Sequence, residues 1–474
     1  MVEWKEIKMK SLEFWRAFKR EKLGLIGLGI LILLVILAAL APFIADPNTM
    51  KEWRNPKYWE DNPQGVPPEW ISIFTGKSYA KQEIKEPHLV KMENYSTTRV
   101  EYWEVKYDYQ YDVPPSGIQI KLSTVIKNPA NPPLLIIDFI RPDNEKLELL
   151  RKQVTSESLT LNLHLEESVK RAALSFARKC GDVEVEGKSL SEITAPMVMS
   201  ILFSQKGTGM SNPGKAKPLK GEYIIEFMII FNAPEEKVKS FEVRFLGRVY
   251  GLLGTDDTGR DLFSGIIWGI WVAMVIGLIA SSVSVMIGVL YGVISAYASG
   301  IKSEILKRIN DIFYVMPVLP ILIAMAAAWK PSIWNIALLI ALFGWPGTAV
   351  VVKSMALQIK EEPFIEAAKA VGASDAKIVF RHIMPQILPY AFATIALSVP
   401  TAILTEAGLS FLGLGDPTIP TWGQILHDAN ARLATVRGMW WWIIPPGFMI
   451  ALVGLSFAFI GMALDKILNP KLVK

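Results

Sequence analysis

Cysteine and histidine are scarce in this chain of 474 residues, and their scarcity excludes several kinds of site. The single cysteine, Cys180, cannot form an intrachain disulfide. The four histidines are His88, His164, His382 and His427, and they are scattered along the sequence. This scatter argues against a His/Cys metal site, and equally against a hydrolase that pairs a nucleophile with a histidine base.

A complete phosphate-binding loop is also missing. The nearest approach is GMSNPGKA at residues 209–216, where Ala216 follows Lys215. The motif needs Ser or Thr at that position to hold magnesium, so a Gly/Pro turn is the better interpretation. We therefore expect this chain to bind no cofactor or metal and to have no ATPase site of its own.

Long apolar runs are abundant, and 51% of the residues are hydrophobic. The first run, 23–45, is too long for a signal-peptide core and is not followed by a small-residue cleavage site, so we interpret it as a retained transmembrane helix. Five further runs are each near 20 residues or longer, which suffices to cross a bilayer. They cover residues 265–298, 311–328, 333–352, 390–412 and 441–464.

The positive charges are unevenly distributed between the loops of this six-span topology. Loops that carry Lys and Arg stay in the cytoplasm, so the charge pattern places both termini inside and the chain in the cell membrane. Only Lys330, Arg432 and Arg437 fall in the short loops expected outside. The loops expected inside carry Lys5, Lys8, Lys10, Arg16, Lys19, Arg20 and Lys22, then Lys302, Lys307 and Arg308, then Lys353, Lys360, Lys369, Lys377 and Arg381, and finally Lys466, Lys471 and Lys474.

The cytoplasmic N-terminal tail, residues 1–22, contains an amphipathic pattern. Residues 11–20 place Leu12, Trp15 and Phe18 near one face. This pattern predicts an elbow helix that lies on the lipid at the inner membrane surface, with an ordinary solvated tail as the alternative.

A polar region between the first two spans, residues 46–260, is predicted to be an extracytoplasmic α+β domain with its own core. Alternating apolar residues indicate strands, and residues 166–179 and 189–205 have helical patterns. An N-x-S sequence at Asn94 leaves glycosylation open. The alternating sets are Trp103, Val105, Tyr107, Tyr109 and Tyr111, and then Leu159, Leu161, Leu163 and Leu165.

The segment EAAKAVGASDAKIVFRHIMP, residues 366–385, follows the fourth span on the cytoplasmic side. Pro363 suits the first turn of a helix, and Gly372 is typical of the left-handed residue that ends one. Ser374 or Asp375 can cap a second short helix that ends near Pro385. Two short helices are thus expected, with four apolar residues exposed between the spans: Ile378, Val379, Phe380 and Ile383.

Such a segment has two interpretations. It is either a structured loop that packs on its own spans, or a plug for a groove in a cytoplasmic partner. Physical reasoning alone leaves both open.

The residues of this segment resemble the EAA loop of ABC importer permeases. The matching positions are Glu366, Ala367, Ala368, Gly372, Ile383 and Pro385, while Met384 stands where Leu is usual. Four further segments narrow the resemblance to the C-type permease subunit of peptide/nickel importers. They are APFIADP at 41–47, GTDDTGRD at 254–261, EAGLSFLGLG at 406–415 and PTWG at 420–423.

The resemblance covers residues 11–47 and about 250–470, and not the large insert. It implies a type I importer permease fold, with a five-helix core at 261–464, a cytoplasmic EAA loop at 354–389 and a cytoplasmic tail at 465–474. It also implies docking of the EAA helices on ATPase subunits and alternating access. The implied partners are a second permease chain in a heterodimer, two ATP-binding subunits that carry ATP and Mg, and an extracytoplasmic solute-binding protein; no nucleic acid is expected.

Three other features remain open between a structural and a functional interpretation. The acidic residues of 254–261 suit a helix cap at Asp257 or Thr258 better than a metal site. Glu406, with Gly413 and Gly415, is a possible pathway or gate element, although pairing with Ser/Thr hydroxyls or with a partner's Arg would also explain it. The tryptophans at 440–442 suit an aromatic belt at the outer interface.

We conclude from the sequence that the chain is a permease subunit of an ATP-driven importer, with peptides as the expected cargo. An oligosaccharide importer of the same family is the alternative. A membrane sensor would need a cytoplasmic output domain, and only short loops are predicted inside. The role of the insert is left open.

Overall fold

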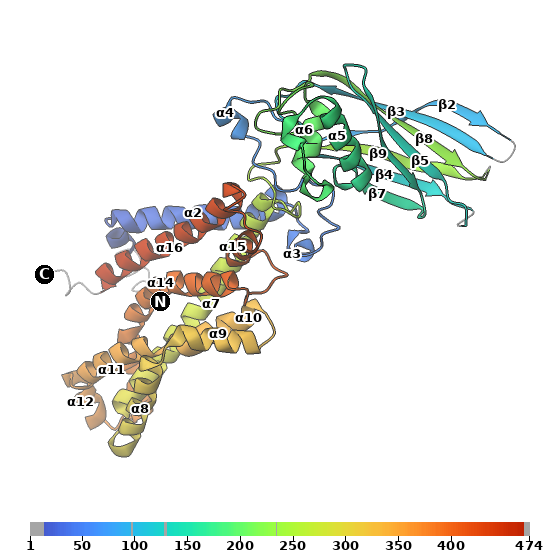
Figure 1. Ribbon diagram of the computed structural model, residues 1–474. Coiled ribbons are helices and arrows are strands. Elements are labelled where there is room, and N and C mark those ends of the chain that lie inside the picture. Colours follow the sequence, from blue (N-terminus) through green and yellow to red (C-terminus); the bar gives the residue numbers. More distant parts are fainter. Residues whose placement is uncertain (1–13, 96–97, 128–129, 234, 469–474) are drawn as a thin grey trace, which may run out of the picture. The chain divides into compact units, whose positions relative to one another are not determined.

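The computed structural model describes residues 14–95, 98–127, 130–233 and 235–468 (Figure 1). The chain divides into two compact units: a helical unit built from the two ends of the sequence, and a unit of residues 56–261. Several residues used in the charge and amphipathicity arguments lie outside the described residues. They are Lys5, Lys8, Lys10, Leu12, Ser96 of the Asn94 sequence, Lys471 and Lys474.

The helical unit consists largely of apolar helices. Five helical segments of the described residues are long and apolar enough to cross a membrane when 333–360 is counted as one, and a bent pair would make a sixth span. The unit comprises α2 (Lys22–Ile44), α3 (Thr49–Glu52), α7 (Leu262–Tyr297), α8 (Gly300–Val315), α9 (Val318–Ala328), α10 (Ile333–Phe343), α11 (Pro346–Lys360), α12 (Pro363–Ala370), α13 (Asp375–Ile378), α14 (Met384–Phe411), α15 (Trp422–Ala431) and α16 (Trp440–Leu468).

The bent pair is α8 and α9, which meet at 82°. The straight helix expected over 311–328 is therefore broken near its start. Pro317, at the junction, has no N–H to donate and its ring crowds the preceding turn, which accounts for the break.

Residues 46–55 belong to the helical unit, although the sequence assigned them to the insert. The backbone N–H of Asp46 donates to Ser264 Oγ at 3.0 Å. Trp53 is buried, and a side chain at Gly265 would meet its ring at 2.5 Å. These contacts fasten the end of the first helix to the start of α7.

Helix α2 packs against α16, so the two ends of the described chain lie together. A Cβ at Gly24 would lie 2.6 Å from Ala463 Cβ, and Ser456 Oγ donates to the carbonyl of Gly27 at 2.7 Å. An ion pair of 2.7 Å between Lys466 and Glu21 adds to this contact. Small residues are what allow apolar helices to approach this closely in a bilayer.

The segment before α2 agrees only in part with an amphipathic elbow. Residues 14–18 are helical, and Trp15 is exposed. Phe18, in contrast, is buried beside Gly24 and so packs on the protein itself.

The tryptophans at the start of α16 differ from the sequence expectation. Trp441 and Trp442 are buried, which contradicts the expected aromatic belt at those two positions.

The second unit is a β-sandwich with three α-helices in its described residues (Figure 1). One sheet has the order β1-β9-β4-β7 and the other has the order β2-β3-β8-β5-β6. Its elements are α4 (Ile71–Thr75), β1 (Glu83–Lys85), β2 (His88–Asn94), β3 (Arg99–Tyr109), β4 (Gly117–Val125), β5 (Leu134–Ile140), β6 (Lys146–Gln153), β7 (Ser158–Asn162), α5 (Glu167–Lys179), α6 (Ala195–Phe203), β8 (Gly221–Phe231) and β9 (Lys237–Leu246).

Alternation along the strands fills the space between the sheets. In β3, Val105, Tyr107 and Tyr109 are buried in one core, as their period of two predicts. The ring of Tyr107 stacks on that of Phe245, with 3.9 Å between centroids. The α+β composition of this region is confirmed.

Two element boundaries differ from the sequence expectation. The strand that begins at Ser158 ends at Asn162, and the chain then turns through a 3-10 helix that leaves Leu165 exposed. Helix α6 begins at Ala195, well after 189, because Pro196 is accommodated only in the first turn of a helix.

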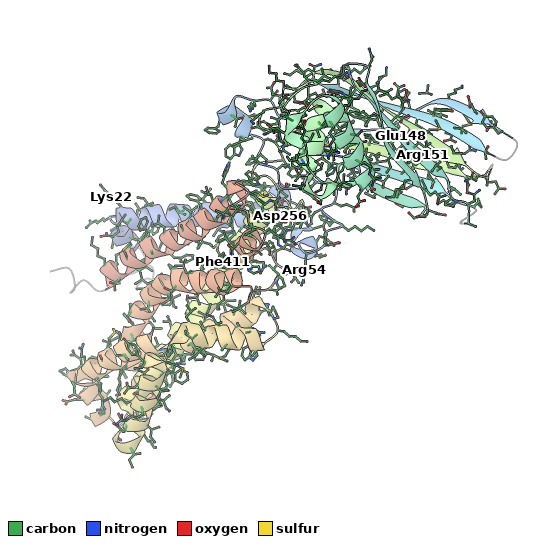
Figure 2. All side chains as sticks on the ribbon, in the orientation of Figure 1. Lys22, Arg54, Glu148, Arg151, Asp256 and Phe411 are labelled. Atoms are coloured by element: carbon green, nitrogen blue, oxygen red, sulfur yellow. The ribbon has the colours of Figure 1, made fainter. Side chains whose placement is uncertain are left out.

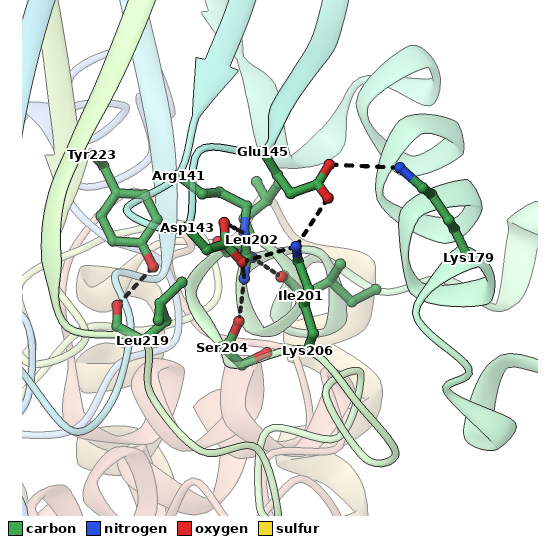
Figure 3. A network of polar contacts seen from close by, with 10 residues as sticks. All are labelled: Arg141, Asp143, Glu145, Lys179, Ile201, Leu202, Ser204, Lys206, Leu219 and Tyr223. Atoms are coloured by element: carbon green, nitrogen blue, oxygen red, sulfur yellow. Dashed lines mark hydrogen bonds and ion pairs between the residues drawn. The ribbon is translucent and has the colours of Figure 1, made fainter.

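A buried arginine joins α6 to the hairpin of β5 and β6 (Figure 3). The guanidinium of Arg141 donates to the carbonyls of Ile201 at 2.8 Å, Leu202 at 2.7 Å and Ser204 at 2.5 Å. It also pairs with Asp143 at 3.2 Å. Arg141 thus satisfies carbonyls at the C-terminal end of α6 and brings a charge that suits the negative end of the helix.

A second polar side chain of this unit, the imidazole of His164, is buried in its neutral form. His164 is 8% exposed, and a Cβ at Gly117 would lie 2.3 Å from its ring. Burial lowers the pKa of His164 from 6.5 to about 4, so the ring is neutral in the folded unit.

We predict that the excised unit 56–261 folds and loses stability as the pH falls from 6.5 towards 4. In this window the unfolded histidine binds a proton that the folded one excludes, so the His164 contribution to the free energy of unfolding falls by up to about 3 kcal/mol. Urea unfolding at several pH values measures this. His164→Gln, which cannot titrate, should flatten the slope; an unchanged slope would contradict the assignment.

Candidate functional site

The candidate site is the stretch 363–385, called the EAA segment from here on. Its first arm is α12. Pro363 occupies the first turn of this helix, and Gly372 ends it with a φ of 81°. The N–H of Gly372 donates to Lys369 O at 2.9 Å, and that of Ala373 donates to Ala368 O at 3.1 Å. This is the Schellman arrangement, which requires the left-handed conformation that glycine adopts without steric cost.

The second arm begins as expected and continues further than expected. Ser374 Oγ accepts from the N–H of Lys377 and caps α13. Residues 379–383 then form a π-helical turn, and the chain continues directly into α14. A separate second short helix is therefore wrong. Pro385 cannot donate to the turn before it, which explains why the hydrogen-bond ladder is rearranged here without the helix ending.

Three isoleucines anchor both arms. Ile365, Ile378 and Ile383 are each 0% exposed. They share a core with residues of α7 and α11, among them Val289 and Val352. The expectation that Ile378 and Ile383 are exposed is thus wrong, because both fill the space between the arms and the long helices.

A different set of apolar side chains faces outward. Val371 is 87% exposed, Phe380 63% and Phe364 41%. Glu366, Ala367 and Pro385 are exposed too, and Ala368 is half-buried. The segment therefore packs on its own chain through one set of side chains and exposes another set. The structured-loop interpretation applies to the buried isoleucines, and the plug interpretation stays a prediction.

Sequence reasoning missed Phe364 and Val371. Each lies directly beside a residue that was recognised for its backbone role: Phe364 follows Pro363, and Val371 precedes Gly372. An apolar residue at the C-cap of a short helix, directly before the glycine that ends it, is a sequence signal that could have been noticed.

Glu406 lies in α14 and is 4% exposed. Its carboxylate accepts a hydrogen bond of 2.7 Å from Ser410 Oγ, and the Thr421 hydroxyl also reaches it. Pairing with hydroxyl groups is therefore realised within this chain. A role for Glu406 in the pathway or gate stays a prediction.

Glycines form the turn between α14 and α15. Gly413 has a φ of 82° and ends α14, and a Cβ there would lie 2.9 Å from the His427 ring. A Cβ at Gly415 would lie 2.2 Å from Ser410 Oγ and 2.9 Å from Ser410 Cα. Figure 2 labels Phe411, the last residue of α14, whose carbonyl meets His427 Nδ1 at 2.8 Å. The contact keeps α15 close to the end of α14.

The loop GTDDTGRD is organised by Asp256, which is fully buried and labelled in Figure 2. Its carboxylate accepts from the N–H of Thr258 at 2.9 Å and of Arg260 at 2.9 Å, and it forms an ion pair with Arg260. Helix α7 begins only at Leu262, so neither Asp257 nor Thr258 caps it. Over the described ranges, no group of three or more His, Cys, Asp or Glu residues could hold a metal ion.

The loop that approximates a phosphate-binding motif is already occupied by a carboxylate of this chain. Asp182 accepts from the N–H groups of Gly209 at 2.9 Å and Ser211 at 2.8 Å. Burial alone would raise the pKa of Asp182, but the hydrogen bonds from Ser211, Gly209 and Glu184 together outweigh it and lower the pKa. The loop amides that a phosphate would need are thus used to close a turn.

Two protein-family models match the chain. The model described as the inner membrane component of binding-protein-dependent transport systems matches residues 284–474. The model of the N-terminal transmembrane domain of oligopeptide transport permease C matches residues 12–62. Residues 63–283 lie outside both matched ranges.

Curated relatives agree with the family models. The chain is 35% identical over 222 residues to the oligopeptide permease OppC of Bacillus subtilis, covering 47% of this chain and 72% of the relative. It is 32% identical over 220 residues to the dipeptide permease DppC of the same organism (46% and 68%), and 34% identical over 221 residues to the glutathione permease GsiD of Pectobacterium atrosepticum (46% and 72%). One chain of the inward-facing MetNI methionine ABC transporter aligns with a TM-score of 0.36 and 19% identity, over 44% of this chain and 95% of its own length.

The helical unit is that of a membrane permease, a protein class whose work is transport. Within that class, the chain belongs to the peptide family of ABC importer permeases, as its similarity to the OppC and DppC proteins shows. Most of its β-sheet unit, residues 63–261, lies outside the ranges that the two family models match.

We predict that Gly415→Ala destabilises the full chain, because its Cβ would collide with backbone as well as side-chain atoms of Ser410. Overpacking of this kind costs on the order of 1–3 kcal/mol. Gly408→Ala is the matched control: its Cβ meets nothing within 4 Å, and alanine favours the helix. Thermal unfolding in detergent compares the two. Equal midpoints would show that the turn tolerates a side chain.

Proposed function

We propose that this chain is one of the two permease subunits of an ABC importer that carries peptides across the cell membrane. Support for the cargo comes from the relatives, which are named for oligopeptides, dipeptides and glutathione. The proposal extends that chemistry to this chain. An oligosaccharide importer of the same family is the alternative that an uptake experiment separates.

The proposed topology has six spans, with α8 and α9 counted as one and both termini in the cytoplasm. The ion pair between Glu21 and Lys466 supports ends that share one side of the membrane. The Lys and Arg residues before the first span and after the second, fourth and sixth spans support the cytoplasm as that side. By parity, the unit 56–261 is then extracytoplasmic.

The observation that carries the proposed mechanism is the two-sided EAA segment. Phe364, Val371 and Phe380 are exposed apolar side chains of this segment, while buried isoleucines join the same segment to α7 and α11. An amphipathic segment of this kind suits a groove in an ATPase subunit. Glu366 lies in the first turn of α12 and adds a charge that suits both the helix dipole and a polar groove rim.

In the proposed complex, this chain pairs with a second permease subunit, and two ATPase subunits bind ATP and Mg. A solute-binding protein delivers cargo from outside. When the ATPases close, they pull on the exposed face of the EAA segment. Because the isoleucine anchors are close-packed with the long helices, the displacement reaches the spans and gives alternating access.

We expect Gly372→Val to abolish uptake while leaving the spans inserted. The φ of 81° makes a side chain there cost about 1 kcal/mol, and valine would point at the docked ATPase, since nothing in this chain lies within 4 Å. Gly438→Val is the control, with a φ of 70° and equally open surroundings but outside the segment. Vesicle uptake and copurification of the ATPase subunits are the measurements.

The outcome distinguishes docking from loop structure. Loss of copurification with Gly372→Val alone supports the coupling role. If both variants transport normally, the segment is only a structured loop. Glu366→Ala should have a milder effect, because an exposed charge contributes about 1 kcal/mol or less.

We also expect the purified chain to hydrolyse no ATP and the assembled complex to do so. The loop at 209–216 has Ala216 where magnesium would need a hydroxyl, and Asp182 occupies its amides. A phosphate-release assay on each preparation tests this. Hydrolysis by the single chain that persists after stringent purification would contradict the expectation.

A separate uptake experiment tests the cargo. If maltohexaose competes with peptide uptake by the assembled complex, the oligosaccharide alternative is favoured.

A further inference from the structure

The unit 56–261 contains a cavity of about 800 Å³ on its four-stranded sheet. The floor of the cavity carries hydroxyl groups from three strands: Ser123 of β4, Thr160 of β7 and Ser240 of β9. A cavity of this size matches those that hold small ligands.

The cavity extends past the face of the sheet and follows one edge of it. It is lined by five consecutive residues of β9, 238–242. Because neighbouring side chains of a strand point to opposite faces, contact with all five requires the cavity to run alongside the strand. It also reaches Trp103, whose ring meets that of Phe241 edge-on at 5.9 Å between the two sheets.

This edge of β9 is open over most of its length. Strand β4 pairs with β9 from Lys237 to Leu246, whereas β1 pairs only with 243–245. The chain then leaves the edge through Glu86 and Pro87 and enters β2 of the other sheet. Pro87 has no N–H with which to extend the ladder, so the β1 track beside 237–242 is left vacant in the described structure.

The charged residues around the cavity are of both signs. Some of them are paired within the chain, Lys121 with Glu60 at 3.6 Å and Lys239 with Glu157 at 3.4 Å. A polyanion or a polycation would be recognised by charges of one sign, so this mixture favours a ligand without a large net charge. The cavity-lining charges are Lys57, Lys121 and Lys239 with Glu60, Glu86 and Glu242.

We propose that this cavity, together with the open edge of β9, binds an extended peptide that adds to the sheet in the track of β1. Main-chain hydrogen bonds to β9 supply the affinity, and Trp103 with Phe241 receives an apolar side chain. A strand edge recognises peptide groups, which an oligosaccharide lacks, so peptide is favoured over sugar. That the peptide is of the transported class rests on the proposed function.

The probe is the hexapeptide Ala-Val-Ala-Val-Ala-Lys with a fluorophore on the lysine side chain. Binding to the full chain in lipid nanodiscs is followed by fluorescence anisotropy. The same peptide with N-methyl groups at alternate residues lacks donors along one edge. We expect its affinity to be at least about tenfold lower, because strand addition depends on those donors. Equal affinity of the two peptides would overturn strand addition.

Variants of the chain locate the site. Ser240 is exposed on the cavity floor, so Ser240→Trp should fill the cavity without disturbing the core and should abolish binding. Glu222→Trp is the control, on an exposed position of β8 in the other sheet, and should bind normally. Normal binding by Ser240→Trp, or binding of maltohexaose in place of the peptide, would overturn the proposal.

Uptake by the assembled importer separates this inference from the proposed function. If wild-type complex transports peptides but the chain shows no cavity-dependent binding, only the cavity proposal fails. If the cavity binds the probe and no peptide is transported, the peptide site stands and the assignment of cargo fails.

Discussion

A bilayer offers no hydrogen-bond partner to a peptide group, and the helical unit is organised by that constraint. Its long segments are helices that satisfy their own backbone, and even the rearranged turn at residues 379–383 preserves a continuous helix into α14. The same constraint explains the polar side chains. The Ser456 hydroxyl donates a hydrogen bond to the backbone of α2, and the Ser410 hydroxyl donates one to the carboxylate of Glu406. These two polar groups are thus paired where water could not serve them.

The EAA segment combines buried side chains that pack on the long helices with exposed apolar ones. Buried and exposed side chains follow one another closely along a short stretch of sequence. Ile378 and Ile383 are buried, and Phe380 between them is exposed. A helical turn separates these side chains in direction, so one segment can pack on α7 and α11 and present a second apolar face. Gly372 forms the turn between the two arms, and no atom of this chain lies within 4 Å of the position that a Cβ would take there.

The unit 56–261 follows the rules of water-soluble proteins, with an alternating core and charges arranged in ion pairs. Lys206 and Lys179 both pair with Glu145, next to the buried Arg141 that secures α6 (Figure 3). Part of the edge of β9, next to the short strand β1, is open. Natural sheets usually cover, shorten or charge such an edge. Here β1 covers only part of it, and a cavity lies along the remainder.

The sequence by itself determined the membrane class, the apolar segments, the α+β insert and the EAA motif, because these depend on composition, on local period and on residues close in sequence. It also determined the left-handed turn at Gly372, which needs only local backbone sterics. The burial of Ile378 and Ile383 and the membership of residues 46–55 in the helical unit were decided by packing between distant segments. The open edge of β9 was likewise decided by tertiary structure, because strand pairing joins residues more than 150 positions apart that no local pattern connects.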